Sequence, residues 1–291
     1  MAEYAYIAPE TVAEALGVLS EHDKKGLKAQ VLAGGTDLLV QMKSGDRDGR
    51  TIVDIKSIEE TNKIEIHDDH TFIGAAIASA ALNERADLKD LFPGLIGAAD
   101  LIGSTQIQGR ASIGGNLCNS SPAGDTIPAL IANAAICIIA NKDGNREIPV
   151  EKFVTGVGTN VLGNDEFLVG IKMANPPART SDAYLRFIPR TEMDIAVAGA
   201  GVALTLDDDG VCIKARIGIG AVAPTALLVP EASEAIVGSK LDDDALRSAA
   251  EACERASSPI SDKRGTADYR KKVVGVLCKR AALIARGRAA R

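Results

Sequence analysis

The 291-residue chain is poor in the residues that several classes of protein require. It has no tryptophan, and its aromatic share of 3% is too low for the platforms on which single-stranded nucleic acids stack. Its 33 Lys and Arg residues are outnumbered by 39 Asp and Glu residues, which gives a net charge of −6. This balance argues against a general binder of nucleic acid or of anionic membranes, because both need clustered cations.

The sequence also lacks long apolar runs and paired cysteines. No run approaches the roughly 18 apolar residues of a membrane-spanning helix, and no basic stretch of a secretory signal opens the chain. The five cysteines are odd in number, widely spaced and without a Cys-x-x-Cys pair. We therefore expect a cytoplasmic protein with no membrane span, no disulfide framework, and no zinc or iron–sulfur site of its own.

Histidine is scarce as well, with three residues at positions 22, 67 and 70. The segment His67-Asp-Asp-His70 offers metal-ligand types, but it lies between two short alternating segments, 64–66 and 71–74. We interpret it as the tip of a β-hairpin. No Ser/His/Asp or Cys/His arrangement has a spacing that supports nucleophilic catalysis, and we predict no catalytic residue and no metal ligand in this chain.

Helices and strands alternate through the first part of the chain, and Asn175-Pro-Pro177 predicts a linker after it. Residues 1–57 read as one small β-α-β lobe and residues 58–175 as a second lobe. In the first lobe we predict a helix from Pro9 to Gly26, a strand over 30–33, a short helix from residue 38 and a strand over 51–55. In the second we predict the hairpin, helices over 82–91, 95–102 and 127–134, and strands over 135–140 and 167–173.

Residues 176–291 form a third section, in which strands come first and helices follow. This order predicts an α+β layer with the helices on one face of an antiparallel sheet. The basic residues near the C-terminus, among them Arg270, Arg286 and Arg288, are interpreted as the solvated face and end of the last helix. The predicted strands span 182–188, 198–206 and 211–219, and the helices about 242–256 and 266–286.

Two glycine-rich segments stand apart: residues 31–38 (VLAGGTDL) and 111–125 (ASIGGNLCNSSPAGD). Each places a Gly-Gly pair beside hydroxyl side chains and near an Asp. Paired glycines let successive backbone N–H groups converge, and they let an anion approach where a Cβ would block it. One such loop is a common turn, but two favour a diphosphate held from both sides, and hence a dinucleotide.

Other matches to nucleotide motifs fail on their context. Neither glycine loop is a P-loop, because no Gly-Lys-Ser/Thr follows. Gly218-Ile-Gly220 runs into Pro224, which blocks the helix that a dinucleotide fingerprint needs, and Gly199-Ala-Gly201 opens a strand; we interpret both as sheet glycines. Cys118, inside the second loop, is interpreted as a small buried thiol, with a redox-sensitive cysteine as the alternative.

The chain resembles the FAD-binding (medium) subunits of the molybdenum hydroxylases, the group that includes carbon monoxide dehydrogenase and bacterial xanthine dehydrogenase. The resemblance covers nearly the whole chain. It is specific because two glycine loops of different sequence occur together with characteristic C-terminal segments. It is carried by residues 33–38 (AGGTDL), 112–116 (SIGGN), Asp125, 166–168 (EFL), 190–196 (RTEMDIA), 220–225 (GAVAPT) and 264–270 (RGTADYR).

The resemblance implies an α+β protein: a two-lobed FAD-binding domain of PCMH type over residues 1–175, and a smaller C-terminal domain of the CO dehydrogenase flavoprotein type over 176–291. FAD would be bound non-covalently. Arg186 stands where relatives often carry Lys, and a cation there would stabilise an anionic reduced flavin; Ile195 would lie near the isoalloxazine face. The cofactor-binding residues implied are Val31, Leu32, Ala33, Gly34, Gly35, Thr36, Asp37, Leu38, Ile102, Ser112, Ile113, Gly114, Gly115, Asn116, Asp125, Leu168, Arg186 and Ile195.

The function implied is electron transfer within a hetero-oligomeric oxidoreductase. In the family, substrate is oxidised at a molybdopterin centre in a large subunit, and electrons pass through [2Fe–2S] clusters of a small subunit to this FAD. The FAD then passes these electrons to NAD or another acceptor. Two alternatives remain open from the residues: a stand-alone FAD-dependent oxidoreductase of the same superfamily, and an assembly subunit with a vestigial nucleotide site, against which the intact loops argue.

Overall fold

The N-terminal part of the chain is a small parallel sheet covered by one helix. The computed structural model describes residues 4–45 and 49–291. Strand β3 lies between β1 and β2 and is parallel to both, so the predicted β-α-β unit is present. The helix α1 begins at Val12 rather than at Pro9, because the Thr11 hydroxyl accepts from the Glu14 amide and caps it. The elements are β1 (Ala5–Ile7), α1 (Val12–Lys24), β2 (Ala29–Leu32), α2 (Leu38–Lys43) and β3 (Thr51–Asp54).

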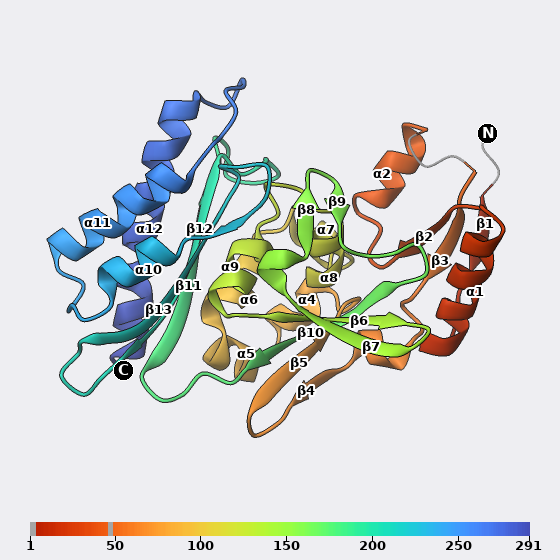
Figure 1. Cartoon of the computed structure of the whole chain (residues 1–291), viewed down its shortest axis with the longest axis horizontal. Helices are drawn as coiled ribbons and strands as arrows, with labels where there is room; N and C mark the ends of the chain where they lie inside the picture. The colour runs from red at the N-terminus through yellow and green to blue at the C-terminus, as the bar shows by residue number, and fades with distance from the viewer. Residues whose placement is uncertain (1–3, 46–48) are drawn as a thin grey trace.

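The second part is built around a five-stranded sheet in the order β4-β5-β10-β6-β7, with all neighbours antiparallel. Short helices lie beside it (Figure 1). Its strands are β4 (Ile64–Ile66), β5 (His70–Gly74), β6 (Ile136–Asn141), β7 (Gly144–Pro149) and β10 (Phe167–Ala174), and β8 (Val154–Gly156) pairs with β9 (Thr159–Asn160). Its helices are α3 (Glu59–Asn62), α4 (Ser79–Asn83), α5 (Ala86–Leu91), α6 (Pro93–Asp100), α7 (Thr105–Gln108), α8 (Ile113–Cys118), α9 (Thr126–Ala132) and the 3-10 turn Val150–Lys152.

The first two parts share a hydrophobic cluster. Ala15 and Leu19 of α1 and Val53 of β3 pack with Phe167 and Val169 of β10. A larger cluster fills the space between the five-stranded sheet and helices α4, α5, α6, α8 and α9. The N-terminal part is therefore anchored on the five-stranded sheet by apolar burial.

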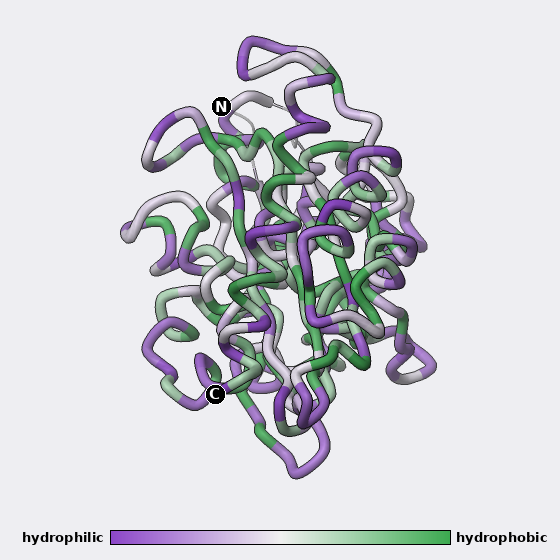
Figure 2. Tube along the Cα trace, turned by 90° about the vertical axis from the view of Figure 1, so that its left-hand side faces the viewer, coloured by the Kyte–Doolittle hydropathy of each residue, from purple (hydrophilic) through white to green (hydrophobic). Residues whose placement is uncertain are grey.

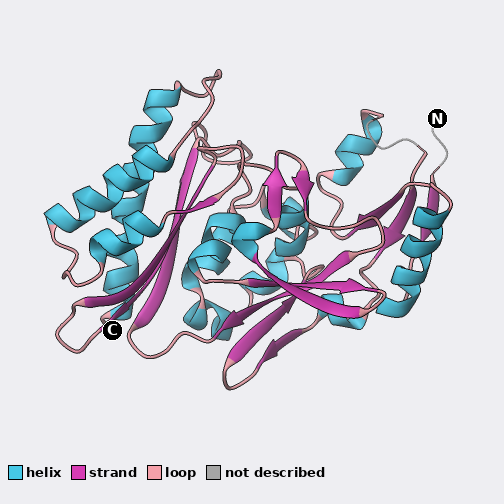
Figure 3. Cartoon of the chain, viewed as in Figure 1, coloured by secondary structure: helices cyan, strands magenta, loops and turns pink. Residues whose placement is uncertain are grey.

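The C-terminal part is an antiparallel sheet with helices on one face, as the sequence predicts (Figure 3). Helices α11 and α12 pack on each other and α12 packs on β11 and β12, around a core rich in alanine. Figure 2 shows hydrophilic residues gathered along the outer loops. The elements are β11 (Thr180–Phe187), β12 (Ala198–Leu206), β13 (Cys212–Gly220), β14 (Leu227–Leu228), α10 (Pro230–Ile236), α11 (Asp243–Ala256) and α12 (Ala267–Ala289).

The other face of this sheet packs on helices α6 and α9 of the second part. Gly201 and Gly218 are direct partners across β12 and β13, and a Cβ on either would lie within 2.6 Å of the Pro128 carbonyl oxygen in α9. The interpretation of these residues as sheet glycines is thus confirmed: they allow a helix to lie directly on the sheet.

A buried carboxylate crosses the same interface. Asp182 of β11 accepts from the Gly94 amide at 2.7 Å, from the Leu95 amide at 2.9 Å and from Asn133 Nδ2 at 2.7 Å. It therefore caps the N-terminus of α6 from a distant part of the sequence. Burial raises the pKa of Asp182, and these hydrogen bonds oppose that rise.

Two sequence predictions about the helices need correction. The predicted helix over 82–91 is two helices, α4 and α5, and the solvated basic face of the last helix does not include Arg270. Arg270 is buried, and its guanidinium bonds Asp262 at 2.7 Å and the Val197 carbonyl at 3.0 Å. No helix within residues 4–45 and 49–291 has both the length and the apolar character to cross a membrane.

The interface on α6 can be tested with two glycines of that helix. A Cβ on Gly94 would lie 2.7 Å from the Ala183 backbone, whereas a Cβ on Gly97 meets nothing within 4 Å. Gly94→Ala should lower the free energy of unfolding by about 1–3 kcal/mol through overpacking. Gly97→Ala should leave it unchanged or raise it by up to about 1 kcal/mol, since alanine favours the helix. Urea unfolding of both variants measures the difference, and equal stability of the two would contradict the packing described.

Candidate functional site

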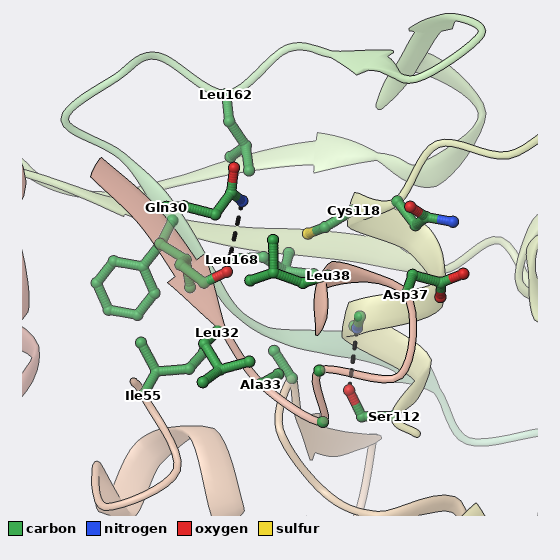
Figure 4. A pocket seen from close by; sticks show the side chains of 18 of the residues that line it. Gln30, Leu32, Ala33, Asp37, Leu38, Ile55, Ser112, Cys118, Leu162 and Leu168 are labelled. Carbon is green, nitrogen blue, oxygen red and sulfur yellow. Dashed lines mark hydrogen bonds between the residues drawn. The ribbon is translucent and has the colours of Figure 1, made fainter. Parts of the chain in front are cut away.

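A cavity of about 460 Å³ lies between the N-terminal sheet and the second part of the chain. One wall is the end of β2 and the loop that leads into α2, and another is the start of α8. The β8–β9 hairpin and the loop that leads into β10 form the third wall. Figure 4 shows side chains from all three walls facing the same space.

The first glycine loop follows the carboxyl end of β2, where parallel strands commonly present ligand-binding loops. Gly34 touches the second part directly: a Cβ there would lie 1.8 Å from the Arg110 carbonyl oxygen. Gly35 has a φ of +76°, a left-handed conformation that glycine adopts without strain. Both positions therefore require glycine, one for close approach and the other for backbone conformation.

This loop presents backbone donors that the fold leaves unused. In the described part of the chain, no hydrogen bond uses the amides of Gly34, Gly35, Thr36 or Asp37 as donor. Consecutive amides without intramolecular acceptors are a common means of binding an anionic group. The loop thus has the donor set that a diphosphate requires, with glycines where a side chain would obstruct it.

The second glycine loop faces the first across the cavity. The Ser112 hydroxyl caps α8 by accepting from the Gly115 amide at 3.0 Å (Figure 4). Asn116 accepts from the Thr126 amide and hydroxyl through Oδ1, at 3.3 and 2.8 Å. Its Nδ2 is therefore the end of the side chain left for a ligand. A Cβ on Gly114 would overlap Ala75, so this loop also packs by backbone contact.

Polar residues that the motif analysis did not single out also line the cavity: Gln30 on β2, and Asn160 and Asn164 on the third wall. Glu166 organises this wall. It accepts from Arg146 Nε at 2.8 Å, from Arg146 Nη2 at 2.7 Å and from the Gly163 amide at 2.8 Å. Arg146 lowers the pKa of Glu166 to about 2. The 166–168 segment was noted in the sequence, but nothing in its spacing indicated the partner on β7.

Cys118 lies on the cavity wall, with its sulfur atom visible in Figure 4. Burial raises the pKa of this thiol to about 12. A thiol with such a pKa is protonated at neutral pH and is a poor nucleophile, which favours the interpretation as a packing residue over the redox-sensitive one.

Most of the residues singled out in the sequence gather around this cavity. Ile113 lies just behind the wall, buried in the main hydrophobic cluster. Those that line the cavity are Val31, Leu32, Ala33, Gly34, Gly35, Thr36, Asp37, Leu38, Ile102, Ser112, Gly114, Gly115, Asn116 and Leu168.

Three of the residues singled out lie outside the cavity lining, toward the C-terminal part. Asp125 is buried and accepts from Arg186 at 2.5 Å and from Tyr184 Oη at 2.9 Å, so it joins α9 to β11. Burial raises the pKa of Asp125, and Arg186 and Tyr184 act in the opposite direction. Ile195 is 55% exposed, in a loop that Asp194 anchors by accepting from Arg264 at 3.1 Å.

The histidines lie where the hairpin interpretation places them. His67 and His70 are at the β4–β5 hairpin, with ring centroids 4.5 Å apart, and they lie away from the cavity lining. His22, on α1, bonds the Thr51 hydroxyl of β3 at 2.9 Å. Within residues 4–45 and 49–291, no three His, Cys, Asp or Glu side chains gather in a metal-binding arrangement.

The Arg146–Glu166 pair predicts a pH dependence of stability. Because the folded-state pKa of Glu166 is lowered from 4.5 to about 2, its contribution is fully present above pH 4.5 and is lost as the pH falls toward 2. Glu166→Gln should cost about 1–2 kcal/mol of unfolding free energy at neutral pH, and this difference should shrink as acid protonates the wild-type carboxylate.

Urea unfolding of both proteins over a series of acidic pH values measures this effect. The control is Glu147→Gln, next to Arg146 on β7, because Glu147 forms a solvent-exposed pair with Lys172 and should contribute little at any pH. A difference for Glu166→Gln that stays constant with pH would contradict the role of the ion pair.

Comparison with known proteins agrees with the fold and the glycine loops. Residues 2–175 match the family model for the FAD-binding domain in molybdopterin dehydrogenase, and residues 183–285 match that for the CO dehydrogenase flavoprotein C-terminal domain. The chain is 33% identical to the carbon monoxide dehydrogenase medium chain of Afipia carboxidovorans, over 98% of each chain. It is 29% identical to the xanthine dehydrogenase FAD-binding subunit of Escherichia coli O157:H7, over 95% of this chain and 94% of that one.

The solved structures give the same result. A carbon monoxide dehydrogenase chain from Hydrogenophaga pseudoflava superposes with a TM-score of 0.93 at 31% identity, over 99% of both chains. The two family models, the relatives that match over nearly their whole length and the superposition are mutually consistent. The chain belongs to the family of FAD-binding subunits of the molybdenum hydroxylases and is an oxidoreductase subunit.

Proposed function

We propose that FAD is held non-covalently in the cavity between the two lobes, with its diphosphate between the two glycine loops. The observation that carries this proposal is the set of four consecutive unused amides, Gly34 to Asp37, opposite the capped start of α8. A diphosphate needs donors on two sides, and the two loops supply them without intervening side chains. Asp37 and the free amide of Asn116 are available to hydroxyl groups of the cofactor.

The buried cluster at the C-terminal junction extends the proposed site. Tyr184 and Arg186 of β11 meet Asp125, which immediately precedes Thr126, the residue that fixes Asn116. The Arg186 side chain is 7% exposed, and its guanidinium forms an ion pair with Asp125. We propose that this cation faces the flavin end of the cofactor, and that Ile195 covers the ring from the adjoining loop.

We propose that the chain works as the electron-transfer subunit of a larger assembly. Bound FAD supplies the redox chemistry, since flavins accept electrons singly and release them as a pair. A small partner with [2Fe–2S] clusters would deliver the electrons, and a large molybdopterin partner would oxidise the substrate. NAD or another acceptor would take the electrons on. The residues of this chain bind and orient the cofactor and exclude water from it.

The proposed function divides the chain into two domains. Residues 1–175 form the FAD-binding domain, with lobes at about 1–57 and 58–175, and residues 176–291 form the C-terminal domain. The five cysteines are all free and four are buried, which favours a reducing compartment, and we place the assembly in the cytoplasm.

Native mass spectrometry of the chain, purified gently from its own source, tests the proposed assembly. We expect a complex with one FAD per copy of this chain and with masses that fit a [2Fe–2S] subunit and a molybdopterin subunit. A chain that carries FAD but has no such partners would contradict the electron-transfer proposal and favour a stand-alone flavoenzyme.

The proposed position of the diphosphate predicts a specific effect of Gly35→Ala. The substitution puts a side chain at φ +76° and against Leu32, so the loop must shift and its amides lose their alignment. We expect the affinity for FAD to fall at least about tenfold, equivalent to the loss of one charge-assisted hydrogen bond.

The matched control is Gly26→Ala, which has a similar φ of +66° but lies outside the FAD cavity, with nothing within 4 Å of its Cβ. It carries the same backbone strain and should retain FAD. Flavin content per chain and a thermal unfolding curve are measured for both variants. Full flavin occupancy of a folded Gly35→Ala chain would contradict the proposed placement.

A further inference from the structure

Lys56 lies behind the first glycine loop and does not line the cavity. It follows β3 by two residues, and its Nζ donates to the Ala33 carbonyl oxygen at 3.1 Å. The neighbouring carbonyl, that of Leu32, accepts from the Ile55 amide at 3.0 Å. The end of β3 thus holds two successive carbonyls of the segment that leads into the Gly-Gly pair.

The lysine itself is held in place. Its Nζ lies 2.7 and 2.6 Å from the two carboxylate oxygens of Asp54, and the Asp54 side chain is only 9% exposed. Tyr6 Oη donates to the same carboxylate at 2.6 Å. Although desolvation acts to raise it, the pKa of Asp54 is lowered by its bonds to Lys56 and Tyr6. The ammonium group is therefore fixed on the carbonyl by a charged and nearly buried partner.

The geometry of the peptide group connects Lys56 to the cavity. The Ala33–Gly34 peptide is trans, so its C=O and N–H point in opposite directions. A carbonyl fixed toward Lys56 turns the Gly34 N–H away from Lys56, and this amide has no acceptor among the described residues. A cation on the oxygen also polarises the peptide and makes its N–H a stronger donor.

Few positively charged side chains line the cavity. Arg50 is the one Lys or Arg among the described residues that line the cavity, and it bonds Gln30, away from the glycine loops. A diphosphate between the loops would therefore meet backbone N–H groups and no Lys or Arg side chain. Lys56 bonds the carbonyl of the peptide that carries the first of those amides.

We propose that Lys56 is a positioning residue for the dinucleotide diphosphate, acting through the Ala33–Gly34 peptide without touching the ligand. This inference rests on the proposed placement of FAD. Lys56 orients and polarises the Gly34 amide, and Asp54 and Tyr6 fix Lys56. Lys56 thereby strengthens the binding of ligands that carry the diphosphate and does not affect the binding of a nucleoside without phosphate.

The test compares the affinities of the flavin-free full-length chain for FAD, for ADP and for adenosine, which lacks phosphate. Lys56→Met removes the charge but keeps the length of the side chain, and we expect it to weaken FAD and ADP binding about tenfold while adenosine binding stays unchanged. Lys56→Arg should restore most of the lost affinity because it keeps the cation. Lys63→Met is the control, since Lys63 has a similar exposure of 34% and pairs with Glu65 outside the cavity.

Two results would overturn the role of Lys56. Unchanged ADP affinity in a folded Lys56→Met chain would show that the lysine does not act on the diphosphate. Equal losses for ADP and adenosine would show that the substitution only disturbs the pocket. A wild-type chain that binds neither FAD nor ADP would instead overturn the placement of FAD, and the role of Lys56 with it.

Discussion

The contact between Gly34 and the Arg110 carbonyl is the constraint on which the cavity depends. It brings the backbone of the first glycine loop against the chain just before the second, so the two loops face each other across a short gap. A Cβ at Gly34 would lie 1.8 Å from that carbonyl oxygen, so a side chain there would push the two loops apart. Backbone-to-backbone contact is what allows unpaired amides to converge without side chains between them.

The rest of the structure supports this contact from both sides. Apolar packing of α1 and β3 on β10 fixes the N-terminal lobe, and Lys56 and Ile55 hold the carbonyls at the end of β2. On the other side, Asp182 caps α6. The paired sheet glycines allow α9 to pack on the sheet, and α9 carries Thr126, the residue that bonds Asn116. The C-terminal part therefore supports the second loop, and its Arg186 bonds Asp125 at the junction between the second and C-terminal parts.

Periodicity and glycine content predicted the features that are local in sequence. The long helices α11 and α12, the antiparallel C-terminal sheet and the two loops were each predicted from a clear pattern in one continuous segment of the sequence. Strand β1 was missed because it has three exposed residues and is defined by pairing with β3. The burial of Arg270 was missed because its partners, Asp262 and the Val197 carbonyl, meet it only in the folded chain.

The residues of the candidate site likewise include some that the sequence predicted and others that it did not. The donors of the loop at 34–37 were predictable, because glycine pairs have few uses other than turns and ligand approach. The third wall and the Lys56–Asp54–Tyr6 group were not, because each depends on a partner far away in sequence: Arg146 for Glu166, Ala33 for Lys56 and Asp54 for Tyr6. Long-range polar pairs carry no periodic signal.

Amide hydrogen exchange, with and without FAD, tests the central claim most directly. If the diphosphate lies between the loops, FAD should slow exchange at Gly34 to Asp37 and at the start of α8 together, because those amides gain acceptors. The β4–β5 hairpin, which lies away from the cavity lining, should exchange at the same rate in both states. Binding of FAD with no change at the two glycine loops would contradict the account.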